Sequence, residues 1–217
     1  MAIADYDSLV AAIKSYAARS DSTFSARIPD FVALAEDRLY NGGGEPGDPI
    51  YSAPLRSKSM EISGTITLVT GVGTIPDDAL EIRKLYRSGD LYGIAYMPPE
   101  RLAVTGAVGG GVYPVYYTSV GSELRVTPSY DGDLDIDYYR RYTAISSSNT
   151  TGELLTAHPL LYLEACLFEA FSFMDEPPLA LGHLAKLRGM VAGANRTSAA
   201  LRYSGPLRQR PRVVIGG

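Results

Sequence analysis

The chain has 217 residues with a formal net charge of −4; 46% of them are hydrophobic and 20% charged, which is typical of a globular protein with its own core. No run of 18 apolar residues and no basic, apolar leader is present, so we expect no membrane span, no signal peptide and synthesis in a cytoplasm. The single cysteine, Cys166, excludes an intramolecular disulfide, and two separated histidines, His158 and His183, argue against a zinc site.

Two amphipathic helices are predicted at the N-terminus. Asp5 is a good N-cap, and apolar residues recur at spacings of three and four from Tyr6 to Ala17, with Tyr16 on the expected buried face. A second helix is predicted to begin near Ile28-Pro29, because proline suits the first helical position, and to stop at Asn41-Gly42. Its expected buried face consists of Ile28, Phe31, Val32, Ala35 and Leu39.

The middle of the chain changes to a strand-like pattern. A loop rich in Gly, Pro and Ser covers residues 41–58, and β-branched residues predict short strands from about Ser59. Residues 77–86 are predicted to be a strand with a helical start. Residues 88–121 are loop-rich, with a strand at 113–120.

A hairpin is the clearest prediction in this region. Its arms are residues 123–127 and 133–142, and its turn contains Asp131-Gly132, a pair that is favoured where turn residues need positive φ. Alternation in the second arm predicts one face buried and the other solvated. The buried face would hold Leu134, Ile136 and Tyr138, and the solvated face Asp133, Asp135 and Asp137.

The helical period returns after a polar linker at residues 146–151. A third helix is predicted to start at Pro159, capped by Thr156 or His158, with Cys166 as a small core residue. Its expected apolar stripe is Leu160, Leu163, Leu167, Ala170, Phe171 and Met174. A fourth helix is predicted to open at residues 175–178 and run to about Ser198, with a stripe of Leu181, Leu184, Leu187, Val191 and Ala194.

These elements predict an α+β fold, because helices and strands are segregated along the chain. The N- and C-terminal helix pairs would form a helical bundle from residues 1–45 and 152–199. Residues 46–151 would form an inserted, mainly antiparallel β domain, and residues 200–217 an extended basic C-terminal arm.

The C-terminal part of the chain is basic. From His183 to Gly217 it has seven Lys or Arg and no Asp or Glu, whereas the preceding residues have 13 basic and 24 acidic side chains. Such an arm could dock on a protein, bind DNA phosphates or serve only to keep the chain end soluble. We favour protein docking, because the arm has apolar anchors and little aromatic interleaving. The candidate docking residues are Arg202, Tyr203, Leu207, Arg208, Arg210, Arg212, Val213, Val214 and Ile215.

Several short patterns resemble catalytic or cofactor-binding motifs, but the residues around them do not fit those motifs. Residues 42–47 match G-x-G-x-x-G, but a predicted helix precedes them, and Pro46 and Pro49 forbid a helix start. The aspartates at 131, 133, 135 and 137 lack the glycine and the twelfth-position acid of a calcium loop, so a solvated strand face is favoured. A glycosidase would need a second acid across a cleft. We therefore predict no catalytic residue, cofactor or metal.

Several segments in order resemble the head–tail connector adaptor proteins of tailed bacteriophages, including podovirus tail accessory or tubular proteins and gene-transfer-agent adaptors. Residues 6–16 and 30–39 resemble the opening helical pair of that family. Residues 75–83 resemble its Leu-Pro-x-Asp-Phe-Leu-Glu segment, residues 135–140 its Tyr-Tyr-x-Arg strand, and residues 154–171 its closing helix. The chain departs from the family pattern in the Gly-rich loop at 42–47 and the linker at 104–112.

The resemblance implies a non-enzymatic subunit of a twelve-membered ring at the virion neck. Its implied partners are further copies of itself, the portal protein and a downstream tail or stopper protein, with genomic DNA passing through the lumen without sequence-specific binding. The alternatives are another virion structural protein, such as a tail completion or minor tail subunit, a cell-wall glycosidase and a DNA-binding module.

Overall fold

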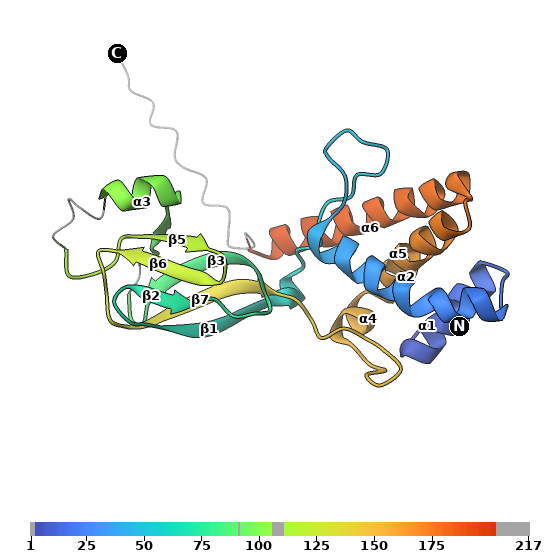
Figure 1. The fold of residues 1–217 in the computed structure, drawn as a ribbon, viewed down its shortest axis with the longest axis horizontal. Coiled ribbons are helices and arrows are strands. Elements are labelled where there is room, and N and C mark those ends of the chain that lie inside the picture. Colours follow the sequence, from blue (N-terminus) through green and yellow to red (C-terminus); the bar gives the residue numbers. More distant parts are fainter. Residues whose placement is uncertain (1–2, 91, 106–110, 203–217) are drawn as a thin grey trace, which may run out of the picture. The chain divides into compact units, whose positions relative to one another are not determined.

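The computed structural model describes residues 3–90, 92–105 and 111–202. The chain divides into two compact units, one of residues 1–58 and 158–217 and the other of residues 59–157. The first is helical and the second is mainly β, which confirms the predicted α+β class (Figure 1). Residues 46–58 fall in the helical unit and residues 152–157 in the β unit, whereas the boundaries expected from the sequence placed them the other way round.

The helical unit contains α1 (Tyr6–Tyr16), α2 (Ser22–Asn41), α5 (Pro159–Phe173) and α6 (Pro177–Arg202). The predicted cap of α1 is confirmed, since the Asp5 carboxylate accepts a hydrogen bond from the Ser8 N–H at 2.8 Å. The predicted stop of α2 is also confirmed: Gly42 has φ 76° and donates its N–H to the Arg38 carbonyl at 2.8 Å. Local capping chemistry thus sets the ends of these helices.

The predicted start of the second helix near Ile28-Pro29 was wrong. Asp21 caps α2, its carboxylate accepting from the Phe24 N–H at 3.0 Å, and the helix is already two turns long when it reaches Pro29. Pro29 is exposed and donates no hydrogen bond to the preceding turn. Burial of Phe24 and of the predicted face against the rest of the bundle outweighs that lost bond.

α5 is the central helix of the bundle and packs against α1, α2 and α6. Its predicted start at Pro159 is confirmed, with His158 as the N-cap residue. Because neighbours cover it on several sides, ten of its 15 residues are buried, including Tyr162 and Cys166. Three residues expected on buried stripes are exposed instead, because each lies near a helix end: Tyr16, Leu160 and Leu181.

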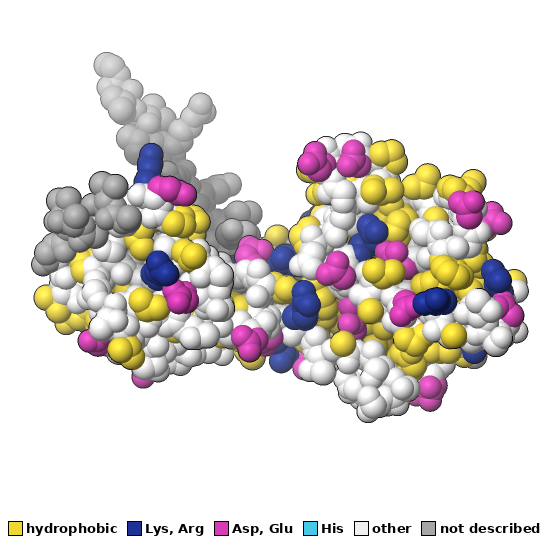
Figure 2. Space-filling model, viewed as in Figure 1, with side chains coloured by type: hydrophobic (Ala, Val, Ile, Leu, Met, Phe, Trp, Pro, Cys, Tyr) yellow, Lys and Arg dark blue, Asp and Glu magenta, His cyan; other side chains and the backbone are white. Residues whose placement is uncertain are grey.

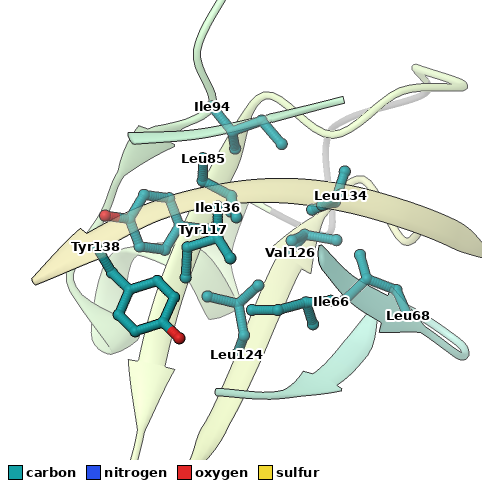
Figure 3. Close-up of a cluster of buried hydrophobic side chains, with 10 residues drawn as sticks. All are labelled: Ile66, Leu68, Leu85, Ile94, Tyr117, Leu124, Val126, Leu134, Ile136 and Tyr138. Carbon is teal, nitrogen blue, oxygen red and sulfur yellow. The ribbon is translucent and has the colours of Figure 1, made fainter. Parts of the chain in front are cut away.

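The β unit has two sheets. The strands are β1 (Glu61–Leu68), β2 (Val72–Thr74), β3 (Ala79–Arg87), β4 (Ala95–Tyr96), β5 (Tyr116–Val120), β6 (Glu123–Thr127) and β7 (Gly132–Arg140). One sheet has the order β1-β7-β3 and the other β2-β6-β5-β4, and only the short β4–β5 pair is parallel. The sheets pack around one buried cluster, which Figure 3 shows: Ile66, Leu68, Leu85, Ile94, Tyr117, Leu124, Val126, Leu134, Ile136 and Tyr138.

The predicted hairpin between residues 123–127 and 133–142 was wrong in its pairing. Both strands exist, but β6 pairs with β5 and β2, while β7 pairs with β1 and β3 in the other sheet. The segment around Asp131 therefore carries the chain across the sandwich. A two-residue hairpin instead joins β5 to β6, where Val120 faces Glu123 and Gly121 has φ 62°.

Smaller elements also differ from the sequence prediction. Residues 77 and 78 form a turn, so β3 has no helical start. The strand expected from Tyr113 begins at Tyr116, and the loop-rich region contains β4 and the helix α3 (Pro99–Thr105). Besides β4 and α3, two further short elements were not predicted: the 3-10 helix η1 (Lys58–Met60) and α4 (Glu153–Ala157). Such short elements carry little periodic signal.

Candidate interaction surfaces

The predicted docking arm lies almost entirely outside the described residues. The helix expected to end near Ser198 continues to Arg202, so the backbone of that residue belongs to α6. The other candidates, Tyr203, Leu207, Arg208, Arg210, Arg212, Val213, Val214 and Ile215, fall in residues 203–217, beyond the described part. Their role in docking stays a prediction.

The helix that leads into the arm is fixed to the segment that follows α2. The Arg188 guanidinium donates to the backbone carbonyls of Asp48, Pro49 and Tyr51. Further along α6, Ser198 Oγ accepts the Lys58 N–H at 2.9 Å. These contacts join residues about 140 positions apart in the chain, so periodicity along α6 did not reveal them.

Polar groups also join the helices inside the bundle. Arg38 on α2 forms an ion pair with Glu169 on α5 at 2.8 Å, and its guanidinium lies 4.3 Å from the centre of the Phe168 ring. Between α5 and α6, Glu164 contacts His183 Nδ1 at 2.6 Å. These pairs link neighbouring helices, a structural use of charge in a partly buried setting.

Two buried groups have strongly perturbed acidity. The Tyr162 hydroxyl donates to the Glu36 carboxylate, and burial together with that carboxylate raises the pKa of Tyr162. Burial also raises the pKa of the Cys166 thiol well above its ordinary value. The core position predicted for Cys166 is confirmed, because it is fully buried. A thiol of this kind is a poor nucleophile.

The outer face of the β1-β7-β3 sheet carries a row of carboxylates, which we call the aspartate row: Asp133, Asp135 and Asp137 on β7. The predicted alternation is confirmed, since Leu134, Ile136 and Tyr138 between and beside them are buried. Hydroxyl groups of β1 hold the row in place. Ser63 donates to Asp137 at 2.6 Å, Thr65 to Asp135 at 3.4 Å and Thr67 to Asp133 at 2.7 Å.

The aspartate row produces a local negative field. On the neighbouring strand, the carboxylates of Asp137 and Asp135 raise the pKa of the Tyr86 phenol, with a contribution from desolvation. Lys84 is the register partner of Asp137, and its ammonium lies 4.2 Å from the centre of the Tyr86 ring. The three carboxylates of the aspartate row outnumber the one ammonium group of Lys84, so this part of the sheet face is acidic.

The row does not match the catalytic and calcium-binding alternatives. Its carboxylates lie side by side along one strand and accept from hydroxyls of β1, whereas a glycosidase pair stands across a cleft. The preceding Asp131 accepts the backbone N–H of Thr70. Across residues 3–90, 92–105 and 111–202, no group of three or more His, Cys, Asp or Glu is placed to hold a metal ion.

The Gly-rich segment at 42–47 is a loop that is closed at its base by backbone hydrogen bonds. Gly43 and Ser52 exchange them at 2.9 and 2.7 Å. Residues 44–50 are all exposed. The loop follows a helix and leads into no helix N-terminus, so it lacks the strand–loop–helix setting of a dinucleotide site.

Each unit has a surface hollow with apolar side chains in its lining. One, of about 480 Å³, lies in the β unit beside β3 and β5 and includes Ile75, Ile82, Tyr96 and Tyr117 in its lining. The other, of about 370 Å³, lies between α2 and α5, where Leu34 and Phe173 are 53% and 46% exposed. On the face shown in Figure 2, acidic, basic and hydrophobic side chains are intermixed over the helical unit.

Comparison with known proteins gives a match over nearly the whole chain. The family model described as SU10 adaptor protein matches residues 4–210. No curated protein sequence matches the chain. None of the helices in the described part is long and apolar enough to cross a lipid bilayer.

Proposed function

Because the chain belongs to the SU10 adaptor protein family of phage head–tail adaptors, we propose that its copies form a ring that joins the portal protein to the tail. Membership in this family makes the chain a phage structural adaptor. The position beneath the portal, the number of copies, which we take to be twelve, and the passage of DNA through the lumen are our proposal. The observation that carries it is the family match over residues 4–210.

A closed ring needs two different complementary faces on each copy, because a cyclic interface is heterologous. The helical unit is suited to supply one of them. Its exposed Leu34 and Phe173 lie at the hollow between α2 and α5, and exposed apolar groups at a hollow are typical of protein contacts. We therefore expect the ring contacts to involve this unit.

The charge of the chain suits a conduit for DNA. Residues 1–182 have 13 basic and 24 acidic side chains, so this part repels the phosphate backbone on average. A lumen with this character would allow DNA to slide past, without the grip that a basic surface provides. No sequence-specific DNA contact is needed for such a role.

The C-terminal arm is the proposed portal-docking element. The family match continues past the end of α6 to residue 210, so part of the arm belongs to the segment that the family shares. Its basic and apolar residues, from Arg202 to Ile215, suit an acidic or apolar surface on the portal.

The test is a truncation after Arg202, which keeps the whole of α6. We expect the truncated protein to keep its circular dichroism spectrum and unfolding midpoint and to lose co-purification with the portal protein by at least tenfold. A point-substituted control, Arg125→Ala, changes an exposed residue of β6, outside the helical unit, and should dock normally. Normal docking by the truncated protein would overturn the role of the arm.

Electron microscopy of particles with a labelled copy tests the position. Label at the neck supports the adaptor ring, and label elsewhere in the virion favours a tail completion or minor tail subunit. Binding to DNA, if it occurs, should weaken steeply with salt, because released counterions drive phosphate contacts. Weak DNA binding together with strong portal binding is the result that the proposal expects.

A further inference from the structure

The aspartate row has a regular spacing that defines what it can bind. Asp133, Asp135 and Asp137 alternate along β7, so successive carboxylates are about 6.8 Å apart along the strand. The hydroxyls of β1 fix them on the exposed face of the sheet. An extended segment with three cations at alternate positions would match this row in number, spacing and sign.

The C-terminal arm contains such a segment. Arg208, Arg210 and Arg212 stand at alternate positions, and no acidic residue occurs between His183 and Gly217. Each proline favours extended backbone at the residue before it: Pro211 at Arg210, and Pro206 at Gly205. In an extended conformation, alternate side chains point to the same side and repeat at the strand spacing.

We propose that Arg208, Arg210 and Arg212 of one copy bind the aspartate row of a second copy. The inference deepens the proposed function, on which it rests, because a ring supplies the second copy. This assignment narrows the portal contact proposed for the arm, because the three arginines then serve the neighbouring copy. The residues left for the portal include the apolar end of the arm: Val213, Val214 and Ile215. The arm thereby joins two neighbours at once: the arginines hold the next copy, and the apolar end holds the portal.

The negative charge of the aspartate row favours binding of the arginines of the arm over binding of DNA. The row repels phosphates, and Lys84 neutralises only part of it. Guanidinium groups form bidentate hydrogen bonds with carboxylates, which adds direction to the attraction. Single exposed ion pairs contribute little, so three matched pairs and the high local concentration within a ring are both needed. The contact should therefore weaken as salt rises.

Cysteine cross-linking tests the contact in the full-length chain. Asp135→Cys and Arg210→Cys are made in separate chains, mixed and oxidised, with the buried Cys166 kept in both. We expect a disulfide-linked dimer in the mixture, at least tenfold above either variant alone. The matched control replaces Asp135→Cys by Glu123→Cys, an exposed acidic position on β6 of the other sheet, and should give only background.

Neutralising the row provides a second test. The triple variant Asp133→Asn, Asp135→Asn, Asp137→Asn keeps oxygens that accept from Ser63, Thr65 and Thr67, so the sheet should stay intact by circular dichroism. Arg210→Cys in one chain and Tyr86→Cys in another, at the register partner of Asp135 on β3, should cross-link when the three aspartates are present. The yield should fall at least tenfold when the second chain also carries the triple substitution. An unchanged yield would overturn the role of the carboxylates.

Cross-linking is measured both on concentrated free protein and on protein bound to the portal. Absence of the mixed dimer in both settings overturns this inference, even where portal docking is normal and the proposed function stands. Mixed dimers without any portal binding support the contact and count against the proposed function. A single chain that carries both substitutions is the last control. If it forms an intramolecular disulfide while the mixture gives no dimer, the claim that the arm binds a second copy is overturned.

Discussion

The side-chain oxygen of Asn195, on α6, accepts the backbone N–H of Arg56 at 2.7 Å, although 139 residues separate the two. The amide nitrogen of Asn195 donates to the Pro54 carbonyl at 2.9 Å. One side chain therefore satisfies two backbone groups of the segment that leaves the helical unit. This segment has no regular secondary structure around Arg56, so hydrogen bonds from side chains such as Asn195 are needed to fix its backbone.

Replacing Asn195 by Ala should destabilise the helical unit by about 1–3 kcal/mol, because partly buried backbone groups lose their hydrogen bonds. Urea unfolding followed by circular dichroism measures the change. Asn41→Ala is the matched control, since Asn41 is exposed and donates to the exposed carboxylate of Asp37. A loss no larger than that of the control would show that the segment is held by other contacts.

Stability should fall at alkaline pH because of Cys166. The pKa of its thiol is raised by burial in the folded state, whereas an unfolded cysteine ionises near pH 8.5, so the unfolded state gains charge first. Below about pH 8.5 the thiol is protonated in both states and does not change the free energy of unfolding with pH. Above it, ionisation of the unfolded state lowers the free energy of unfolding, by about 1.4 kcal/mol between pH 7.5 and 9.5. Cys166→Ala should remove this decline, measured from urea midpoints across that range. The same slope in both proteins would contradict the assignment.

Gly42→Ala should destabilise the end of α2. Gly42 has φ 76° and ψ −164°, a region open essentially to glycine, and an added Cβ would lie 2.6 Å from the Ser52 carbonyl oxygen. We expect a cost of about 1–3 kcal/mol from the backbone alone. Gly189→Ala in α6 is the opposite case: nothing lies within 4 Å of its added Cβ, and helix propensity should raise stability by about 0.5–1 kcal/mol. Thermal unfolding of the two variants should shift in opposite directions.

Ile136→Ala should weaken the β unit by about 2–5 kcal/mol, because Ile136 is fully buried in the cluster between the sheets. Val69→Ala, at a position that is 66% exposed, should change stability by less than about 0.5 kcal/mol. Tyrosine fluorescence during urea unfolding reports on both units, since Tyr117 and Tyr138 are buried in the β unit and Tyr162 in the helical unit, so the unfolding midpoints of the two variants are compared with that of the unsubstituted protein. Equal effects of the two substitutions would count against a shared core of the two sheets.

Much of the local structure was predictable from the sequence. Asp5 and Gly42 mark helix ends by their own hydrogen bonds, and the buried face of α2 follows from apolar spacing. The solvated aspartates and buried Leu134, Ile136 and Tyr138 follow from strand alternation. In the candidate site, the arginines of the arm and the aspartate row were each visible, since charge and spacing are properties of short segments.

The pairing of strands was not predictable in the same way. The sequence Tyr130-Asp131-Gly132 favours a tight turn, yet the chain crosses there from one sheet to the other, because Leu124, Val126, Leu134 and Ile136 all enter the same core. The alternation of apolar and polar residues predicts which side chains a strand buries, but it does not predict which strand pairs with it. Likewise, only the fold shows that Ser63, Thr65 and Thr67 anchor the aspartate row.

By itself the sequence determined the α+β class, the caps and faces of most helices, and the division into an acidic body and a basic C-terminal arm, since these depend on residues a few positions apart. Tertiary structure decided the sheet order, the true start of α2 and the attachment of residues 48–58 to α6. Those features depend on contacts between distant segments, whose burial outweighs local preference.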